Sequence, residues 1–352
     1  MNPRLKRVLQ ALVSIVLLGA IFWYVFQQFA DFSDVWAALK TLTMLELAAL
    51  AAMTAVNLLT YWIVVKIATP GLTLPQAGVL TQSTTAVANS VPAGGAIALG
   101  LTYTILSSWG FSKSRATVSI VVTGIWNNFV KLGTPILALT LLALQGERSG
   151  GKLAGAVLGL VGLVGAIVIF ALILAREGFA ARFGNATGHI ASRIIGLFGK
   201  PPVQGWDLAV VKFRERVIGL VRHRWIQLTL ATIASHAALY AVLVTSLRVM
   251  GVSDVEVGWA QILAVFAFAR LLTAIPLTPG GVGVVELALI AGISRGGGDD
   301  AEVVAAVLLF RLLTYVLPIF IGAFTYLYWR VNRSWRDSAP PLAAEFTIPA
   351  EA

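Results

Sequence analysis

The sequence contains no cysteine and few charged side chains. Without cysteine there is no disulfide framework, no thiolate nucleophile and no cysteine metal site. Charged residues make up 12% of the chain, about half the usual share. The three histidines lack metal-ligand spacing, and the sequence has no P-loop for a nucleotide. The scarcity of charge argues against cytosolic enzymes and nucleic-acid readers, and nothing in the sequence indicates a cofactor or a metal.

Apolar residues, by contrast, make up 58% of the 352 residues. A water-facing surface could not hide so much apolar area, so the bilayer is the solvent that fits this chain. About 20 apolar residues cross the hydrocarbon core, and runs of that length predict spans. The predicted spans are residues 8–28, 44–67, 115–144, 153–175, 226–250 and 302–329. We therefore expect an all-α polytopic membrane protein with about six full spans, the first of them uncleaved.

Two further apolar regions, residues 76–109 and 259–294, are interrupted at their middle by glycine and proline. The interruptions read Asn89-Ser90-Val91-Pro92-Ala93-Gly94-Gly95 and Ile275-Pro276-Leu277-Thr278-Pro279-Gly280-Gly281. Proline and paired glycines break the helical hydrogen-bond ladder, so each region is predicted to form a helical hairpin. The sequence leaves open whether the hairpins are re-entrant or cross the membrane.

A shift of 186 residues places Gly94 and Gly95 on Gly280 and Gly281. The first hairpin is predicted to open from the cytoplasm and the second from the outside, so residues 44–144 and 226–329 would form an inverted repeat. Inverted repeats with broken helices near the midplane are typical of secondary transporters. The alternative is that the duplicated hairpins only build a stable bundle.

Lysine and arginine are distributed unevenly over the two predicted sides. If the N-terminus is cytoplasmic, the inner segments hold 18 of these residues and the outer segments hold five. Positive charge is enriched on the cytoplasmic side of membrane proteins, so we expect a multi-pass protein of the cytoplasmic membrane with both termini inside. We predict one transmembrane domain over residues 1–335, followed by a short, disordered cytoplasmic tail over residues 336–352.

The predicted cytoplasmic linker, residues 176–225, is strongly basic. Nine basic and three acidic residues occur in it. Apolar residues recur in it at spacings of three and four, at Trp206, Val210, Phe213, Val217, Leu220 and Val221. This pattern predicts an amphipathic helix that lies on the anionic inner leaflet.

Four ionisable residues, Lys131, Arg270, Glu286 and Arg311, occur within apolar helices. An unpaired charge there costs at least about 2.5 kcal/mol, so these side chains should face one another, water or a ligand. Three cations against one carboxylate leave a positive surplus that an anionic lipid headgroup could neutralise. The alternative for Glu286 is a purely structural pair with an arginine. For Asn128 and Lys131 the alternative is interhelical hydrogen bonding or a snorkelling lysine.

We expect a phosphate group to bind between the half-helices that follow the two glycine pairs, because helix N-termini bind anions. Arg270 and Arg311 would hold the phosphate, and Glu286 would orient the arginines. The full set of candidate substrate-binding residues is Pro92, Gly94, Gly95, Asn128, Lys131, Arg270, Pro279, Gly280, Gly281, Glu286 and Arg311. No catalytic residue is assigned.

At these motifs the chain resembles the flippase-like transmembrane domain of the lysylphosphatidylglycerol synthase family, over about residues 8–330. The second unit carries the resemblance at Arg270-Leu271, Ile275-Pro276, Thr278-Pro279-Gly280-Gly281-Val282-Gly283, Glu286, Arg311-Leu312, Tyr315, Leu317-Pro318 and Gly322. The first unit adds Pro92, Gly94-Gly95, Tyr103, Leu106, Gly110 and Asn128. The resemblance implies a membrane protein that moves phospholipid between leaflets, in the best-known members an aminoacylated phosphatidylglycerol.

Bifunctional members of that family also carry a soluble aminoacyltransferase domain. This sequence ends soon after Trp335, so we do not carry the synthase activity over. We expect a lipid translocase that moves an anionic or modified phospholipid, and not an enzyme. The alternatives are a membrane-embedded transferase acting on lipid-linked substrates and a nontransporting partner of an envelope-lipid enzyme. The lipid, the direction, the energy coupling and the oligomeric state stay open, with a homo-oligomer one option.

Overall fold

The computed structural model describes residue 40 and residues 42–90, 94–145, 150–196, 206–273 and 281–337. The described residues form helices and no strand, which confirms the all-α prediction. The helices are α3 (Met44–Ala68), α4 (Leu74–Ser90), α5 (Gly94–Ser108), α6 (Lys113–Leu144), α7 (Gly150–Ala175), α8 (Glu177–Gly196), α9 (Trp206–Val249), α10 (Trp259–Leu272), α11 (Val284–Ser294), α12 (Asp300–Arg311), η2 (Leu312–Val316), α13 (Leu317–Val331) and α14 (Ser334–Asp337).

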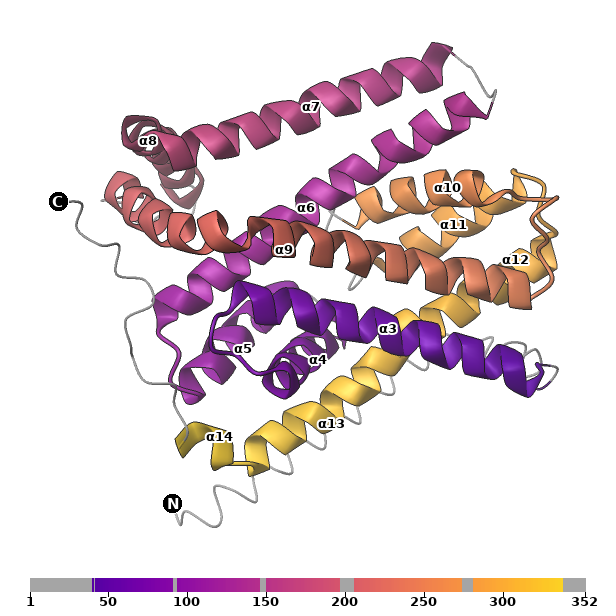
Figure 1. Ribbon diagram of the computed structural model, residues 1–352, viewed down its shortest axis with the longest axis horizontal. Helices are drawn as coiled ribbons and strands as arrows, with labels where there is room; N and C mark the ends of the chain where they lie inside the picture. Colours follow the sequence, from indigo (N-terminus) through magenta and orange to yellow (C-terminus); the bar gives the residue numbers. More distant parts are fainter. Residues whose placement is uncertain are drawn as a thin grey trace.

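Five of the predicted spans fall on helices that are long and apolar enough to cross a membrane. They are Met44–Ala68, Lys113–Leu144, Val157–Ala175, Phe213–Val249 and Asp300–Val331. The span over residues 157–175 has no buried side chain and lies at the outer edge of the bundle (Figure 1). An apolar helix with no buried side chain is suited to lipid, which supports the membrane assignment. The predicted first span, residues 8–28, lies outside the described residues.

The two interrupted regions form helical pairs, α4 with α5 and α10 with α11. The pairs lie toward opposite ends of the molecule: α4 and α5 toward the end with α8 and α14, and α10 and α11 toward the other (Figure 1). Their described helices have 11 to 17 residues. At 1.5 Å per residue they reach about 16 to 26 Å, less than the roughly 30 Å of the hydrocarbon core. These lengths favour hairpins that enter the membrane and return.

Helix boundaries in the two units follow the offset of 186 residues. The end of α11 at Ser294 lies 186 residues after the end of α5 at Ser108. The starts of α10 and α12 match those of α4 and α6 at the same offset to within one residue. The opposed directions of the hairpins agree with an inverted repeat, which remains a prediction.

A π-helical turn, η2, interrupts the last long helix between α12 and α13. Pro318 follows it in the first turn of α13 and has no N–H for the carbonyl of Thr314, which favours a wider turn there. Farther along α13, Gly322 packs against α4, where an added Cβ would collide with the carbonyl oxygen of Gln82. A helix of the second unit therefore packs closely against the hairpin of the first unit.

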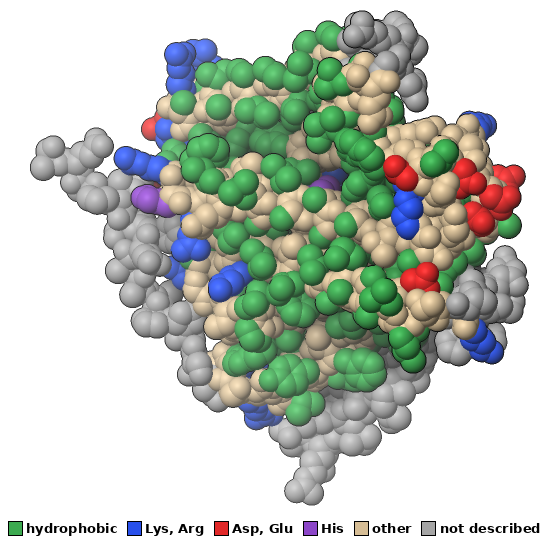
Figure 2. Space-filling view, turned by 45° about the vertical axis from the view of Figure 1, so that its right-hand side comes forward, with side chains coloured by type: hydrophobic (Ala, Val, Ile, Leu, Met, Phe, Trp, Pro, Cys, Tyr) green, Lys and Arg blue, Asp and Glu red, His purple; other side chains and the backbone are tan. Residues whose placement is uncertain are grey.

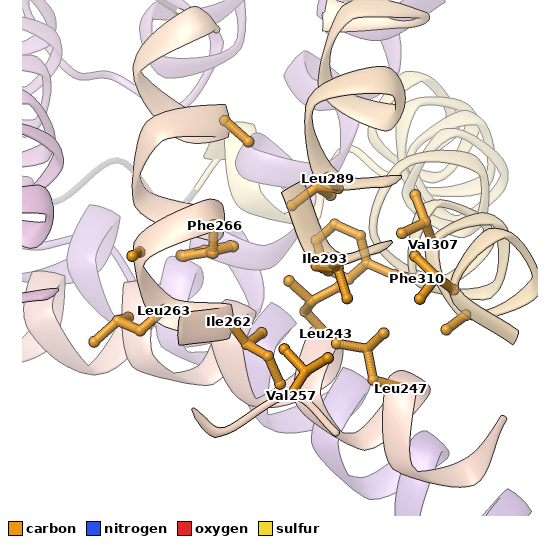
Figure 3. Close-up of a cluster of buried hydrophobic side chains, with 14 of the residues drawn as sticks. Leu243, Leu247, Val257, Ile262, Leu263, Phe266, Leu289, Ile293, Val307 and Phe310 are labelled. Carbon is orange, nitrogen blue, oxygen red and sulfur yellow. The ribbon is translucent and has the colours of Figure 1, made fainter. Parts of the chain in front are cut away.

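The largest described apolar core joins α9, α10, α11 and α12. Figure 3 shows side chains from these helices meeting between them, with Leu243 and Leu247 beside Ile262 and Val257, and Ile293 beside Phe310. Burying side chains of this size contributes about 1.5 to 3 kcal/mol each in water, and inside a bilayer packing replaces most of that term. The cluster fixes α10 and α11 against the long helices.

The basic linker has a different neighbour from the one predicted. Helix α9 has 44 residues, so the amphipathic stripe and the predicted span at 226–250 form one continuous helix. Val217 and Leu220 are buried against residues of α3 and α6. The prediction that this stripe faces the membrane is therefore wrong for these two residues, because the protein itself covers them.

Charged side chains separate along the molecule. Figure 2 shows acidic groups gathered at one end of the visible face, most basic groups toward the other end, and a broad hydrophobic region between them. The acidic residues of the described loops and helix starts include Asp254, Glu256, Asp299, Asp300 and Glu302. Such separation agrees with a basic cytoplasmic end, although the orientation itself remains a prediction.

Candidate functional site

A cavity of about 220 Å³ lies between the two units. Helices α3 and α4 of the first unit line one side of it, and α9 to α13 of the second unit line the other. Its polar lining residues include Asn57, Tyr61, Thr81, Gln82, Thr85, Arg270, Thr273, Arg311 and Thr314. The cavity thus lies at the interface that the predicted repeat would create.

A buried ion pair forms one part of the cavity wall. Arg311 ends α12 and lines the cavity, and Glu286 lies in the first turn of α11. The Nε of Arg311 donates a hydrogen bond to Oε1 of Glu286 at 2.6 Å. The two residues are 7% and 9% exposed. Burying a charge is costly, so removing either residue would leave the other as an uncompensated buried charge and would destabilise the protein.

The same arginine also contacts the helix that follows it. Its guanidinium lies 4.4 Å from the ring centre of Tyr315, a cation–π distance. The hydroxyl of Tyr315 donates to the carbonyl oxygen of Asn89, near the end of α4. A connected series of contacts thus runs from Glu286 in the second hairpin to Asn89 in the first.

Arg270 lies in the last turn of α10 and also lines the cavity. Within the described residues no salt bridge involves it, and its Nε is buried without a hydrogen-bond partner. The hydroxyl of Thr273 donates to the Arg270 carbonyl at 2.6 Å and accepts a hydrogen bond from Nζ of Lys131 at 3.2 Å. Lys131 therefore lies behind this part of the wall and adds a second positive charge.

These contacts divide the intramembrane charges into two groups. Arg311 and Glu286 neutralise each other, whereas Arg270 and Lys131 have no acidic partner within the described part of the chain. Uncompensated cations in a region of low dielectric attract anions strongly. The cavity is therefore suited to binding an anionic group at its Arg270 side.

Four predicted site residues come together at the cavity: Arg270 and Arg311 line it, and Glu286 and Lys131 contact lining residues. Gly281 lies just before α11 with a φ of 72°, a backbone conformation that glycine tolerates.

Other predicted residues lie elsewhere. Asn128 is exposed and is not a lining residue. Gly94 allows close packing, since an added Cβ would lie 2.5 Å from the carbonyl oxygen of Val87, whereas a Cβ on Gly95 would meet nothing. The remaining candidates, Pro92, Pro279 and Gly280, fall outside the described residues. The convergence of both turns on a phosphate therefore remains a prediction.

Sequence reasoning missed the uncharged polar side of the cavity. Asn57 on α3 and Thr81 and Gln82 on α4 all line it. Charge within an apolar helix is a strong signal of a site, and these three residues carry no charge. Their polarity inside apolar helices is a signal that could have identified them.

The described residues around the cavity are better suited to binding an anionic group than to acid–base catalysis. Among the described residues, the carboxylate beside the cavity is that of Glu286, and Arg311 holds it. His236 is buried, and its Nδ1 lies 3.0 Å from the carbonyl oxygen of Thr232. Among the described residues, no three of His, Cys, Asp and Glu are grouped so as to hold a metal ion.

The chain is similar in sequence to a family of membrane proteins and to two known proteins. The model of the lysylphosphatidylglycerol synthase transmembrane region matches residues 10–322. Over 55 residues the chain is 46% identical to a UPF0104 membrane protein of Methanocaldococcus jannaschii. This aligned segment covers 16% of this chain and 24% of that protein. Over 69 residues it is 28% identical to a phosphatidylglycerol lysyltransferase of Staphylococcus haemolyticus. This second aligned segment covers 20% of this chain and 8% of that protein. The chain thus spans a quarter or less of the relatives it matches.

Proposed function

We propose that this chain, which belongs to the lysylphosphatidylglycerol synthase transmembrane-region family, moves an anionic or modified phospholipid between the leaflets of the cytoplasmic membrane. The observation that carries the proposal is the cavity between the two units, with Arg270 in its wall and Lys131 behind it. Cations without acidic partners are costly inside a membrane unless they serve a ligand or a water-filled path.

In this proposal the headgroup phosphate binds at Arg270. Arg311 lines the same cavity but is held by Glu286 and Tyr315, so it shapes the wall and contributes to the local field. The hairpins approach from opposite ends, and their movement would expose the cavity to one leaflet and then to the other. No chemical step is assigned to the chain.

The size of the cavity supports a role for the headgroup alone. Pockets for drug-sized ligands have volumes of about 300 to 1,000 Å³. This cavity, at about 220 Å³, is smaller, so acyl chains would remain in the surrounding hydrocarbon. The basic segment 176–225 would contact anionic lipids of the inner leaflet, with both termini on that side.

Reconstitution into proteoliposomes tests this function. Fluorescent phosphatidylglycerol is incorporated, and its movement to the outer leaflet is followed with a membrane-impermeant quencher. We expect the wild type to accelerate exchange and Arg270→Gln to reduce the rate at least about tenfold, because the headgroup loses a charge-assisted contact. Arg295→Gln, an exposed arginine at the end of α11, serves as the control. Normal exchange by a folded Arg270→Gln protein would contradict the proposal.

A further inference from the structure

A buried histidine beside the cavity has no part in the proposed binding of the headgroup. His236 lies within α9 and is 5% exposed. Leu239, three residues farther along the same helix, lines the cavity. Ionisable side chains inside a membrane are costly, and they commonly belong to ion pathways or proton relays. The surroundings of His236 therefore bear on how the movement of a lipid could be driven.

The two ring nitrogens of His236 have different surroundings. Nδ1 lies 3.0 Å from the carbonyl oxygen of Thr232. A carbonyl oxygen only accepts hydrogen bonds, so in the neutral ring Nδ1 carries the proton and Nε2 keeps a lone pair. Nε2 is buried and has no hydrogen-bond partner among the described residues. Its lone pair is therefore available to bind a proton.

A second histidine of α9 makes the same local contact in a different environment. Nδ1 of His223 lies 3.1 Å from the carbonyl oxygen of Gly219, which is also four residues earlier, but His223 is exposed. The contact with this carbonyl is thus a local feature of a histidine in a helix, and it does not join α9 to a neighbour. The burial of Nε2 is what distinguishes His236.

His236 lies at the level of Arg270 in the membrane. Helices α9 and α10 follow each other along the chain and run in opposite directions (Figure 1). The rings of Tyr240 and Phe266 contact each other, with centres 5.6 Å apart. His236 is one turn before Tyr240 and Arg270 is one turn after Phe266, so in antiparallel helices the two reach the same level. His236 thus lies beside the cationic wall of the cavity.

The charges around His236 are all positive. Arg270 on α10 and Lys131 on α6 are close enough for their charges to act on it. Helices α3, α7, α8 and α12 also pack on α9, and none of their described ionisable groups acts on His236. A proton on Nε2 would add another positive charge here without a carboxylate to balance it. An anion at Arg270 supplies that negative charge, so the anion and the proton each favour the binding of the other.

We infer that Nε2 of His236 binds one proton when an anionic headgroup occupies the cavity, and that the proton crosses the membrane with the headgroup. Water that enters the open cavity supplies the proton, and water on the opposite side receives it after the headgroup has left. Nε2 is sealed from water in this structure, so a bound proton stays in place until the helices move. The inference rests on the proposed function and adds its energy coupling, which is a proton gradient.

Titration calorimetry of the purified full chain with short-chain phosphatidylglycerol tests the uptake of the proton. A phosphodiester does not titrate near neutral pH, so heats measured in buffers of different ionisation enthalpy count the protons that the protein takes up. We expect about one proton for each anion bound, and an affinity that falls by up to about tenfold per pH unit as the pH rises. His236→Gln should bind the lipid without uptake. His223→Gln, the exposed counterpart on α9, should behave as the wild type.

Proteoliposomes with a pH gradient test whether the proton moves with the lipid. The membrane potential is clamped with valinomycin and potassium, and protein-free liposomes give the background. With the wild type, fluorescent phosphatidylglycerol should accumulate in the leaflet on the less acidic side, by up to about tenfold for each unit of pH difference. The His223→Gln protein should do the same, and His236→Gln should remove the accumulation.

The outcomes separate the inference from the proposed function. Binding without proton uptake by the wild type overturns the inference, even if lipid is exchanged and the proposed function stands. Uptake that persists in a folded His236→Gln protein also overturns it, because another group such as Lys131 would then bind the proton. Exchange that does not respond to the pH gradient overturns the coupled movement. Uptake that depends on His236, without any leaflet exchange, supports the proton site and contradicts translocation.

Discussion

The hydroxyl of Tyr315 donates a hydrogen bond to the carbonyl oxygen of Asn89, 2.5 Å away and 226 positions earlier in the sequence. Tyr315 lies in the π-helical turn η2, and its ring contacts the guanidinium of Arg311. The wider π-helical turn changes the direction of the side chains within it, and the ring of Tyr315 points toward the end of α4. The contact joins the end of α4, at the turn of the first hairpin, to the ion pair of the second unit.

Tyr315→Phe removes this hydrogen bond and leaves the carbonyl of Asn89 without its partner. We expect a loss of about 1 kcal/mol in stability, which corresponds to a fall in Tm of roughly 2 °C in a chain of this size. A thermal unfolding curve in detergent measures it. The control is Tyr328→Phe, whose hydroxyl is bonded at an exposed position. An equal Tm for both variants would show that the contact contributes nothing.

The pair between Arg311 and Glu286 allows the structural and functional roles to be separated. Glu286→Gln leaves a buried cation without its partner and should lower stability by about 3 to 5 kcal/mol. Combining Glu286→Leu with Arg311→Met removes both charges and should recover most of that loss, since an apolar pair of similar volume needs no desolvation. Thermal unfolding gives the stability of each variant.

Leaflet exchange by the double variant then decides the role of the pair. If the pair only locks the hairpin, exchange should return together with stability. If it shapes the cavity for the headgroup, the double variant should be stable but at least about tenfold slower than the wild type. We expect the second result, because Arg311 lines the cavity and Glu286 does not.

Much of the fold follows from composition and local chemistry. Apolar length predicts the five described spans, because each helix must cross the same hydrocarbon thickness. Glycine and proline predict the interruptions that separate α4 from α5 and α10 from α11. The neighbour of the linker stripe could not be predicted, because an apolar stripe that faces lipid and one that faces a helix have the same period.

The site could be predicted only in part. Charge inside a membrane is a strong signal, and it identified Arg270, Arg311 and Glu286. The amides of Asn57 and Gln82 give a weaker signal, because uncharged polar residues also serve as interhelical contacts. Which arginine pairs with Glu286 depends on how α11 and α12 pack, and that is a tertiary property that spacing along the chain does not fix.

Lys131 offers a test of cooperation between cations. Lys131→Met removes a positive charge behind the cavity wall together with the hydrogen bond to Thr273. We expect the affinity for phosphatidylglycerol to fall about threefold, less than for Arg270→Gln, since Arg270 lines the cavity and Lys131 does not. Lys113→Met, at the start of α6, is the control. A lower Tm with unchanged affinity would instead make Lys131 an interhelical contact.

Gly322 tests the packing of the second unit on the first. Gly322→Ala would place a methyl group against the carbonyl oxygen of Gln82, so α13 would have to move away from α4. Overpacking of this kind costs about 1 to 3 kcal/mol, and the Tm should fall by roughly 2 to 6 °C. Gly100→Ala is the matched control: it lies within α5 and its Cβ would meet nothing within 4 Å.

The control should be neutral or stabilising by up to about 1 kcal/mol, since alanine favours a helix more than glycine does. Because Gln82 also lines the cavity, Gly322→Ala should slow leaflet exchange as well as lower the Tm, whereas Gly100→Ala should do neither. Normal stability and exchange in Gly322→Ala would mean that α4 and α13 can separate without cost, and that the position of Gln82 does not depend on their contact.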